Sequence, residues 1–154
     1  MSGNATAVDN LPLPNRLLRL LDSGRWPRTY EEALKQNLKS LVPKDRIQLF
    51  APEESAIFLY TPPFYTVAAD IAARQKRGHH TFWSTYAALD SISPELSIVI
   101  GDFGPGSDAP ILLDYRQGGS NTPVIRLQWR KPEANVWVRC ADSFDGFADM
   151  LRLD

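Results

Sequence analysis

The chain has 154 residues, of which 44% are hydrophobic and 23% charged, proportions that are ordinary for one globular domain. Its formal net charge of −1 gives no global field that would draw it to nucleic acid or to anionic lipid. Cys140 is the only cysteine, which excludes an intrachain disulfide and a zinc site built from several cysteines.

The first ten residues are small and polar, and they lack the basic stretch and apolar run of a signal peptide. No apolar run in the chain approaches the roughly 20 residues that a membrane-spanning helix needs. We therefore expect a loose tail over residues 1–10, one domain over residues 11–154, a cytoplasmic location and no membrane partner.

The first part of the domain carries helix signals. A leucine stripe lies between Pro14 and Gly24, which suit the start and the end of a helix. Thr29 and Glu32 have the spacing of a capping box and predict a second helix, which Pro43 would stop. The apolar face predicted for this second helix consists of Ala33, Leu34, Leu38 and Leu41.

The middle of the chain mixes short elements. Residues 57–60 predict a short strand, and the alanine-rich segment 67–73 predicts a helix. A basic loop is expected over residues 74–80. A further helix is expected over residues 81–89, whose apolar side consists of Phe82, Tyr86 and Leu89.

The second half predicts strands over four segments: residues 97–103, 111–115, 124–129 and 136–140. In the third segment Arg126 and Gln128 alternate with apolar residues, which predicts a sheet with one wet face. Asp142 is the expected N-cap of a final helix. Helices grouped early and strands grouped late predict a single α+β domain with a mostly antiparallel or mixed sheet and a C-terminal helix. We expect Trp26, Trp129 and Trp137 to anchor its core.

Several short motifs could carry chemistry, but each fits a structural explanation better. Asp102-Phe103-Gly104 matches the metal-binding tripeptide of protein kinases, yet the chain lacks the other kinase motifs. Asp102, Asp108 and Asp114 do not have EF-hand spacing and suit turns. We expect no metal and no cofactor.

The remaining reactive residue types also lack partners in the sequence. The adjacent pair His79 and His80 cannot share one face of a helix or strand, so it chelates poorly. No serine or cysteine motif marks a nucleophile beside it. Cys140 lies on an alternating strand and is expected to be a buried, unreactive thiol.

Charge is segregated along the chain although the total is near zero. Residues 16–46 hold eight basic residues against four acids, whereas residues 87–115 hold five acids and no lysine or arginine. Such a stretch can steer a charged partner, unless its acids point to different sides of the fold. The predicted partner-binding residues are these five acids: Asp90, Glu95, Asp102, Asp108 and Asp114.

The segment from Ile100 to Tyr115, IGDFGPGSDAPILLDY, resembles the central motif of the SUKH superfamily, and in particular its Knr/Smi-like group. The strand ending at Trp129, the Trp137-Val138-Arg139 stretch and the upstream segment 59–67 are similar to that group in order and spacing. The resemblance covers about residues 11–153. It rests on the order of these segments together, because no single one of them is specific.

The resemblance implies an α+β fold and a non-enzymatic role. Bacterial members of the group are commonly immunity proteins that bind and neutralise polymorphic or contact-dependent toxins, often nucleases or deaminases. The resemblance offers no catalytic residues to transfer, and it implies that the family's glycines and aspartates are structural; here they fall on Gly104, Gly106, Asp108 and Asp114. We expect a protein partner and no nucleic acid. The alternatives are an adaptor that binds a host protein without a toxin and, less favoured, a small enzyme with a site around His79, His80 and the aspartates.

Overall fold

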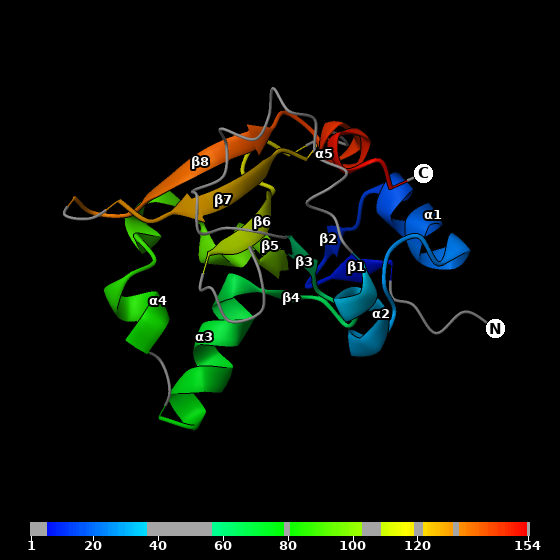
Figure 1. Cartoon of the computed structure of the whole chain (residues 1–154). Coiled ribbons are helices and arrows are strands. Elements are labelled where there is room, and N and C mark those ends of the chain that lie inside the picture. The colour runs from blue at the N-terminus through cyan, green and yellow to red at the C-terminus, as the bar shows by residue number, and fades with distance from the viewer. Residues whose placement is uncertain are drawn as a thin grey trace.

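The computed structural model describes residues 6–36, 57–78, 81–102, 109–118, 122–130 and 133–153. These residues form an α+β fold in which helices cover both faces of a six-stranded antiparallel sheet (Figure 1). The predicted fold class is confirmed.

The described helices are α1 (Asn15–Ser23), α2 (Tyr30–Lys35), α3 (Val67–Lys76), α4 (Thr81–Thr85), α5 (Phe144–Leu151) and the short 3-10 helices η3 (Leu89–Ser91) and η4 (Pro94–Leu96). The strands are β1 (Ala7–Val8), β2 (Leu11–Pro12), β3 (Phe58–Leu59), β4 (Tyr65–Thr66), β5 (Ser97–Asp102), β6 (Pro110–Asp114), β7 (Val124–Gln128) and β8 (Val136–Ala141). The main sheet has the order β3-β5-β6-β7-β8, and β4 pairs with β5 beside β3. β1 and β2 form a separate hairpin.

Side chains alternate along each strand, so the sheet supplies two cores. The main core lies on the face covered by α1 and α5, and includes Leu17, Leu20, Trp26, Ile98, Ile100, Ile111, Leu113, Val124, Phe144 and Phe147. The second core lies on the other face, under α3 and α4, and includes Val67, Trp83, Ala87, Val99, Leu112 and Ile125. Figure 1 shows α3 and α4 on one side of the sheet and α1 and α5 on the other.

The ends of the helices follow local chemistry. Gly24 ends α1 in the left-handed conformation (φ +79°), as predicted. The Thr29 hydroxyl accepts a hydrogen bond from the Glu32 N–H at 3.1 Å and starts α2. At α5 the predicted cap was one residue early, because the Ser143 hydroxyl, and not Asp142, accepts from the Gly146 N–H at 3.0 Å.

The prediction of one wet sheet face was wrong. Arg126 is only 1% exposed, and its Nε and Nη2 donate to the Leu127 carbonyl at 3.2 and 2.9 Å. Alternation along a strand tells which side chains share a face, but it does not tell whether that face is covered. β7 lies between β6 and β8 with helices over both faces, so the arginine is enclosed.

The predicted loose tail is too long. Residues 7–12 form the β1–β2 hairpin, whose turn places Asp9 and Asn10 at φ +49° and +68°. Aspartate and asparagine tolerate this conformation better than other non-glycine residues, and two such residues suit a tight hairpin turn. The Thr66 hydroxyl also donates to the Asp9 carboxylate at 3.3 Å, which ties the turn to β4.

Helix boundaries and faces differ elsewhere too. α3 continues to Lys76, so the predicted basic loop is partly helical, and α4 ends at Thr85 because Ala88 takes a left-handed conformation. In α2 Leu34 is 51% exposed and only Ala33 is buried. Leu38 and Leu41, predicted for the same apolar face, lie outside the described residues. Among the residues described, no helix is long and apolar enough to cross a membrane.

Candidate functional site

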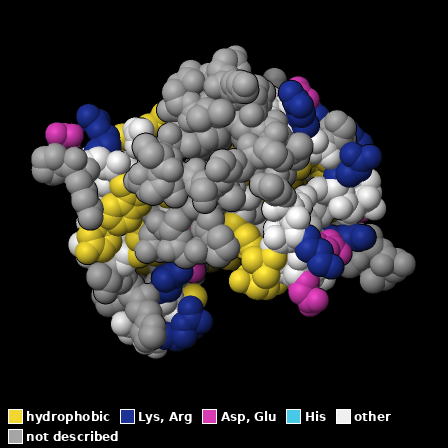
Figure 2. Space-filling view, viewed as in Figure 1, with side chains coloured by type: hydrophobic (Ala, Val, Ile, Leu, Met, Phe, Trp, Pro, Cys, Tyr) yellow, Lys and Arg dark blue, Asp and Glu magenta, His cyan; other side chains and the backbone are white. Residues whose placement is uncertain are grey.

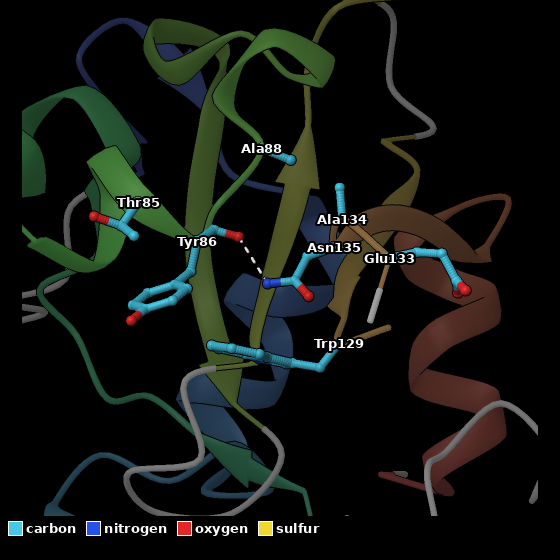
Figure 3. A pocket seen from close by; sticks show the side chains of 7 residues that line it. All are labelled: Thr85, Tyr86, Ala88, Trp129, Glu133, Ala134 and Asn135. Atoms are coloured by element: carbon cyan, nitrogen blue, oxygen red, sulfur yellow. Dashed lines mark hydrogen bonds between the residues drawn. The ribbon is translucent and has the colours of Figure 1, made fainter. Parts of the chain in front are cut away.

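The candidate site is an open groove of about 280 Å³ at the end of the sheet, between the α4–η3 segment and the turn that joins β7 to β8. We call it the Tyr86–Trp129 groove. Its described lining residues are Thr85, Tyr86, Ala88, Trp129, Glu133, Ala134 and Asn135 (Figure 3). Figure 2 shows hydrophobic side chains reaching the surface on this side of the molecule, beside α4.

The first wall of the groove depends on a strained turn. Ala88 follows α4 with φ +48° and ψ +53°, a conformation that costs a residue with a Cβ about 1 kcal/mol. This turn redirects the chain from α4 into η3 and leaves the carbonyl groups of Tyr86 and Ala87 without helical partners. Both carbonyls accept hydrogen bonds from side chains, one just before β8 and one near its start.

Two side chains join the walls across the groove. Asn135 Nδ2 donates to the Tyr86 carbonyl at 2.9 Å, and Trp137 Nε1 donates to the Ala87 carbonyl at 2.6 Å. The Asn135 side-chain Oδ1 accepts from the Arg130 backbone N–H at 3.2 Å, which links the two ends of the connection between β7 and β8. Segments about 50 residues apart in sequence are thus held together by hydrogen bonds at the base of the groove.

Two aromatic rings form the surface of the groove. Tyr86 is 45% exposed, and its ring centroid lies 5.2 Å from that of Trp129 with the planes tilted by 36°. Trp129 is half-buried and also contacts the main core, which fixes its indole. Figure 3 shows both rings on the same side of the Asn135 amide. A tyrosine held in this way offers a large contact area at a low cost in conformational entropy.

The rim of the groove carries one described carboxylate. The Glu133 side chain is 64% exposed and forms a long contact of 4.0 Å with Arg130, which is itself half-exposed. Its carboxylate points away from the two rings (Figure 3). Exposed pairs of this kind contribute little to stability, so the carboxylate can exchange partners.

The five acids predicted to bind a partner do not form one patch. Asp90 and Glu95 are exposed, on η3 and η4. Asp102 and Asp114 are 4% and 3% exposed, so the prediction that they contact a partner was wrong. They lie in strands of the covered sheet, where their buried carboxylates accept hydrogen bonds from other groups of the protein. Asp108 lies outside the described residues.

The two buried aspartates hold loops and strand ends together. Asp102 accepts a hydrogen bond from the Ala109 N–H at 3.0 Å and one from the Tyr60 hydroxyl at 3.3 Å. Asp114 accepts from Arg116 at both oxygens, with its Nε 3.0 Å from Oδ1 and its Nη2 2.9 Å from Oδ2. Burial raises the pKa of Asp114, but the side-chain and backbone hydrogen bonds of Arg116 and its charge outweigh that, and the pKa is lowered overall.

The other chemical candidates give no second site among the described residues. Burial raises the pKa of the Cys140 thiol to about 12, and the charge of Arg126 only partly offsets it. The Cys140 Sγ donates to the Val124 carbonyl at 3.5 Å. Within the ranges that the structure describes, no group of three or more His, Cys, Asp or Glu side chains could hold a metal ion. His79 and His80 lie outside those ranges.

Sequence reasoning assigned Trp129 to the core and placed Tyr86 on the apolar side of a helix. Tyr86 has helical spacing with Phe82 and Leu89, but α4 ends before Tyr86, so that spacing no longer defines a face. Trp129 continues the alternation of β7 and differs only in standing at the strand end, beside the turn. Neither position carries a local sequence signal of exposure.

Comparisons of the chain with protein-family models, with curated proteins and with solved structures found no match.

Proposed function

We propose that the chain is a protein-binding module and, within that class, a bacterial immunity protein that binds and neutralises a cognate toxin domain. The observation that supports a binding module is the Tyr86–Trp129 groove. Residues that dominate protein–protein binding energies are enriched in tryptophan, tyrosine and arginine, and they sit in pockets fixed by neighbouring contacts. A half-exposed tyrosine in tilted contact with an anchored tryptophan meets that description.

The immunity role is the finer part of the proposal, and it rests on the resemblance to the Knr/Smi-like group. Bacterial members of that group commonly neutralise toxins by binding them. The groove offers a physical means of neutralising a toxin, because a rigid surface can block the toxin by binding it, without any covalent bond being made or broken. An adaptor that binds a host protein without a toxin would use the same surface, so the identity of the partner separates the two.

The test is a pull-down from the native organism with the wild-type chain, followed by a growth-rescue assay with the captured domain. The immunity proposal predicts that the captured domain stops growth when expressed alone and that co-expression of the chain restores growth. Tyr86→Ala should reduce rescue, whereas Tyr30→Ala, which removes another exposed tyrosine on α2, should not. A captured domain that is harmless to cells would favour the adaptor, and a toxin that still kills in the presence of the chain would contradict the proposal.

A further inference from the structure

We propose that the Tyr86–Trp129 groove receives a cationic side chain, an arginine or a lysine, from the protein partner. This inference rests on the proposed binding function and specifies what the groove binds. It is carried by the two aromatic faces, the carboxylate at the rim and the size of the groove.

The aromatic rings favour a cation. The face of an aromatic ring is electrically negative, and a cation is attracted to it when it lies within about 6 Å of the ring centre. The two rings contact each other, with centroids 5.2 Å apart and planes tilted by 36°, so a guanidinium or ammonium is received on the solvent-exposed part of the Tyr86 ring. Arginine also has a planar head that stacks on a ring.

The polar groups around the rings point to the same charge. Among the described lining residues there is one carboxylate, Glu133, and no lysine or arginine. The Asn135 amide is already engaged, since Nδ2 donates to the Tyr86 carbonyl and the oxygen accepts from the Arg130 N–H. An anion in the groove would therefore meet no cationic side chain among the described lining residues, whereas a cation has Glu133 within the same wall.

Glu133 is free to change partner at little cost. Its contact with Arg130 is 4.0 Å long, and both side chains are about half-exposed or more, so the pair is weak. The carboxylate faces away from the rings in Figure 3, so it contacts a cation in the groove only when its 64% exposed side chain turns toward the rings. Arg130 is thus the internal competitor that the partner's cation replaces.

The size of the groove suits one side chain. Its volume of about 280 Å³ lies below the 300–1,000 Å³ or so that is typical of small-molecule sites, and it is open to solvent. The methylene stem of a long basic side chain can lie along the apolar wall of the groove while its charged head contacts the Tyr86 ring and the rim.

The test uses N-acetyl-arginine amide as a probe and N-acetyl-citrulline amide, a neutral compound of the same shape, as its control. Binding is followed by nuclear magnetic resonance at the Trp129 indole N–H and the Asn135 side-chain amide. The arginine compound should bind about two- to five-fold more tightly than the citrulline compound. Glu133→Gln should reduce that ratio towards one, Tyr86→Ala should remove binding at these signals, and Tyr30→Ala should change neither.

Equal binding of the two compounds by the wild-type chain, or arginine binding that survives Tyr86→Ala, would overturn the inference. These outcomes are separate from the growth-rescue result. Selective arginine binding without rescue would support the groove's preference and contradict the immunity role, whereas rescue with equal binding of both probes would support the role and overturn this inference.

Discussion

Asp114 is a carboxylate enclosed in the sheet, and its ionisation makes the stability of the fold depend on pH. Its folded-state pKa is lowered, with the opposing effect of burial outweighed by Arg116. The ionised form therefore stabilises the fold above the ordinary aspartate pKa of about 3.9, and this contribution is lost as the pH falls through the folded-state value.

We predict that Asp114→Asn lowers the free energy of unfolding by about 1–2 kcal/mol at pH 7. The expected loss is small because Arg116 is half-exposed, and solvent weakens its attraction to the carboxylate. The difference from the wild type should shrink as the pH falls below about 4, the ordinary aspartate pKa that applies to the unfolded chain, and vanish below the lowered folded-state pKa of Asp114. Urea unfolding at pH 7 and pH 3 measures both values. Asp90→Asn changes an exposed carboxylate and should stay within about 0.5 kcal/mol of wild type. An equal loss for Asp114→Asn at both pH values would contradict the electrostatic explanation.

Cys140 is the second residue whose environment sets its chemistry. Its thiol pKa of about 12 leaves almost no thiolate at pH 8, and the thiolate is the form that reacts. We predict that iodoacetamide labels the folded protein at least about 100-fold more slowly than a free cysteine, whose pKa is about 8.5. Mass spectrometry in the absence and presence of denaturant measures the two rates. Rapid labelling of the folded chain would show that the thiol is accessible and ionised.

At the scale of elements, the close approach of β3 to β5 depends on Gly101. A Cβ placed there would lie 2.9 Å from the Phe58 carbonyl oxygen, a backbone atom that cannot move without shifting β3. Gly101→Ala is therefore predicted to destabilise the fold by about 1–3 kcal/mol.

Gly146 in α5 is the matched control for that substitution. A Cβ at Gly146 would meet only the Ser143 hydroxyl at an ordinary 3.5 Å, and alanine keeps the N–H that the cap requires. Gly146→Ala should be neutral or stabilising by up to about 1 kcal/mol. Thermal and urea unfolding of the two variants give the comparison. Similar stabilities for both would mean that β3 is not held against β5 in the way that the register indicates.

The elements were predictable where local chemistry alone decides them. The leucine stripe of α1 with Gly24, the Thr29 cap and the strands β5 to β8 follow from spacing and turn residues. Arg126 was misplaced because its burial depends on helices supplied by both ends of the chain. Asp102 and Asp114 were predicted to be exposed for the same reason. The sequence of a strand does not show that helices cover the face on which its carboxylate lies.

The groove lay beyond sequence reasoning for a related physical reason. Its walls come from α4–η3 and from the β7–β8 turn, which meet through the hydrogen bonds of Asn135 and Trp137 to the Tyr86 and Ala87 carbonyls. A contact between side chain and backbone over about 50 residues leaves no periodic pattern in either segment. The exposure of Tyr86 also depends on the left-handed turn at Ala88, a residue type that rarely adopts it.

At the scale of the whole molecule, the sheet is covered on both faces, and the exposed large hydrophobic residues among those described are few. They are Tyr30, Leu34, Tyr86 and Leu96. Tyr30 and Leu34 lie on α2, whereas Tyr86 lies in the groove at the end of the sheet. The surface therefore offers two separate tyrosines whose truncation leaves both cores intact, and comparing them locates the binding face.

The most direct test of the account is the dissociation constant for the captured partner domain, measured by calorimetry with wild type, Tyr86→Ala and Tyr30→Ala. Truncation of a central aromatic anchor commonly costs 2 kcal/mol or so, which is roughly a 30-fold weaker affinity. We predict about that loss for Tyr86→Ala and less than about a two-fold change for Tyr30→Ala. Unchanged affinity for Tyr86→Ala, with a loss for Tyr30→Ala, would place the partner on α2 and contradict the groove as the binding site.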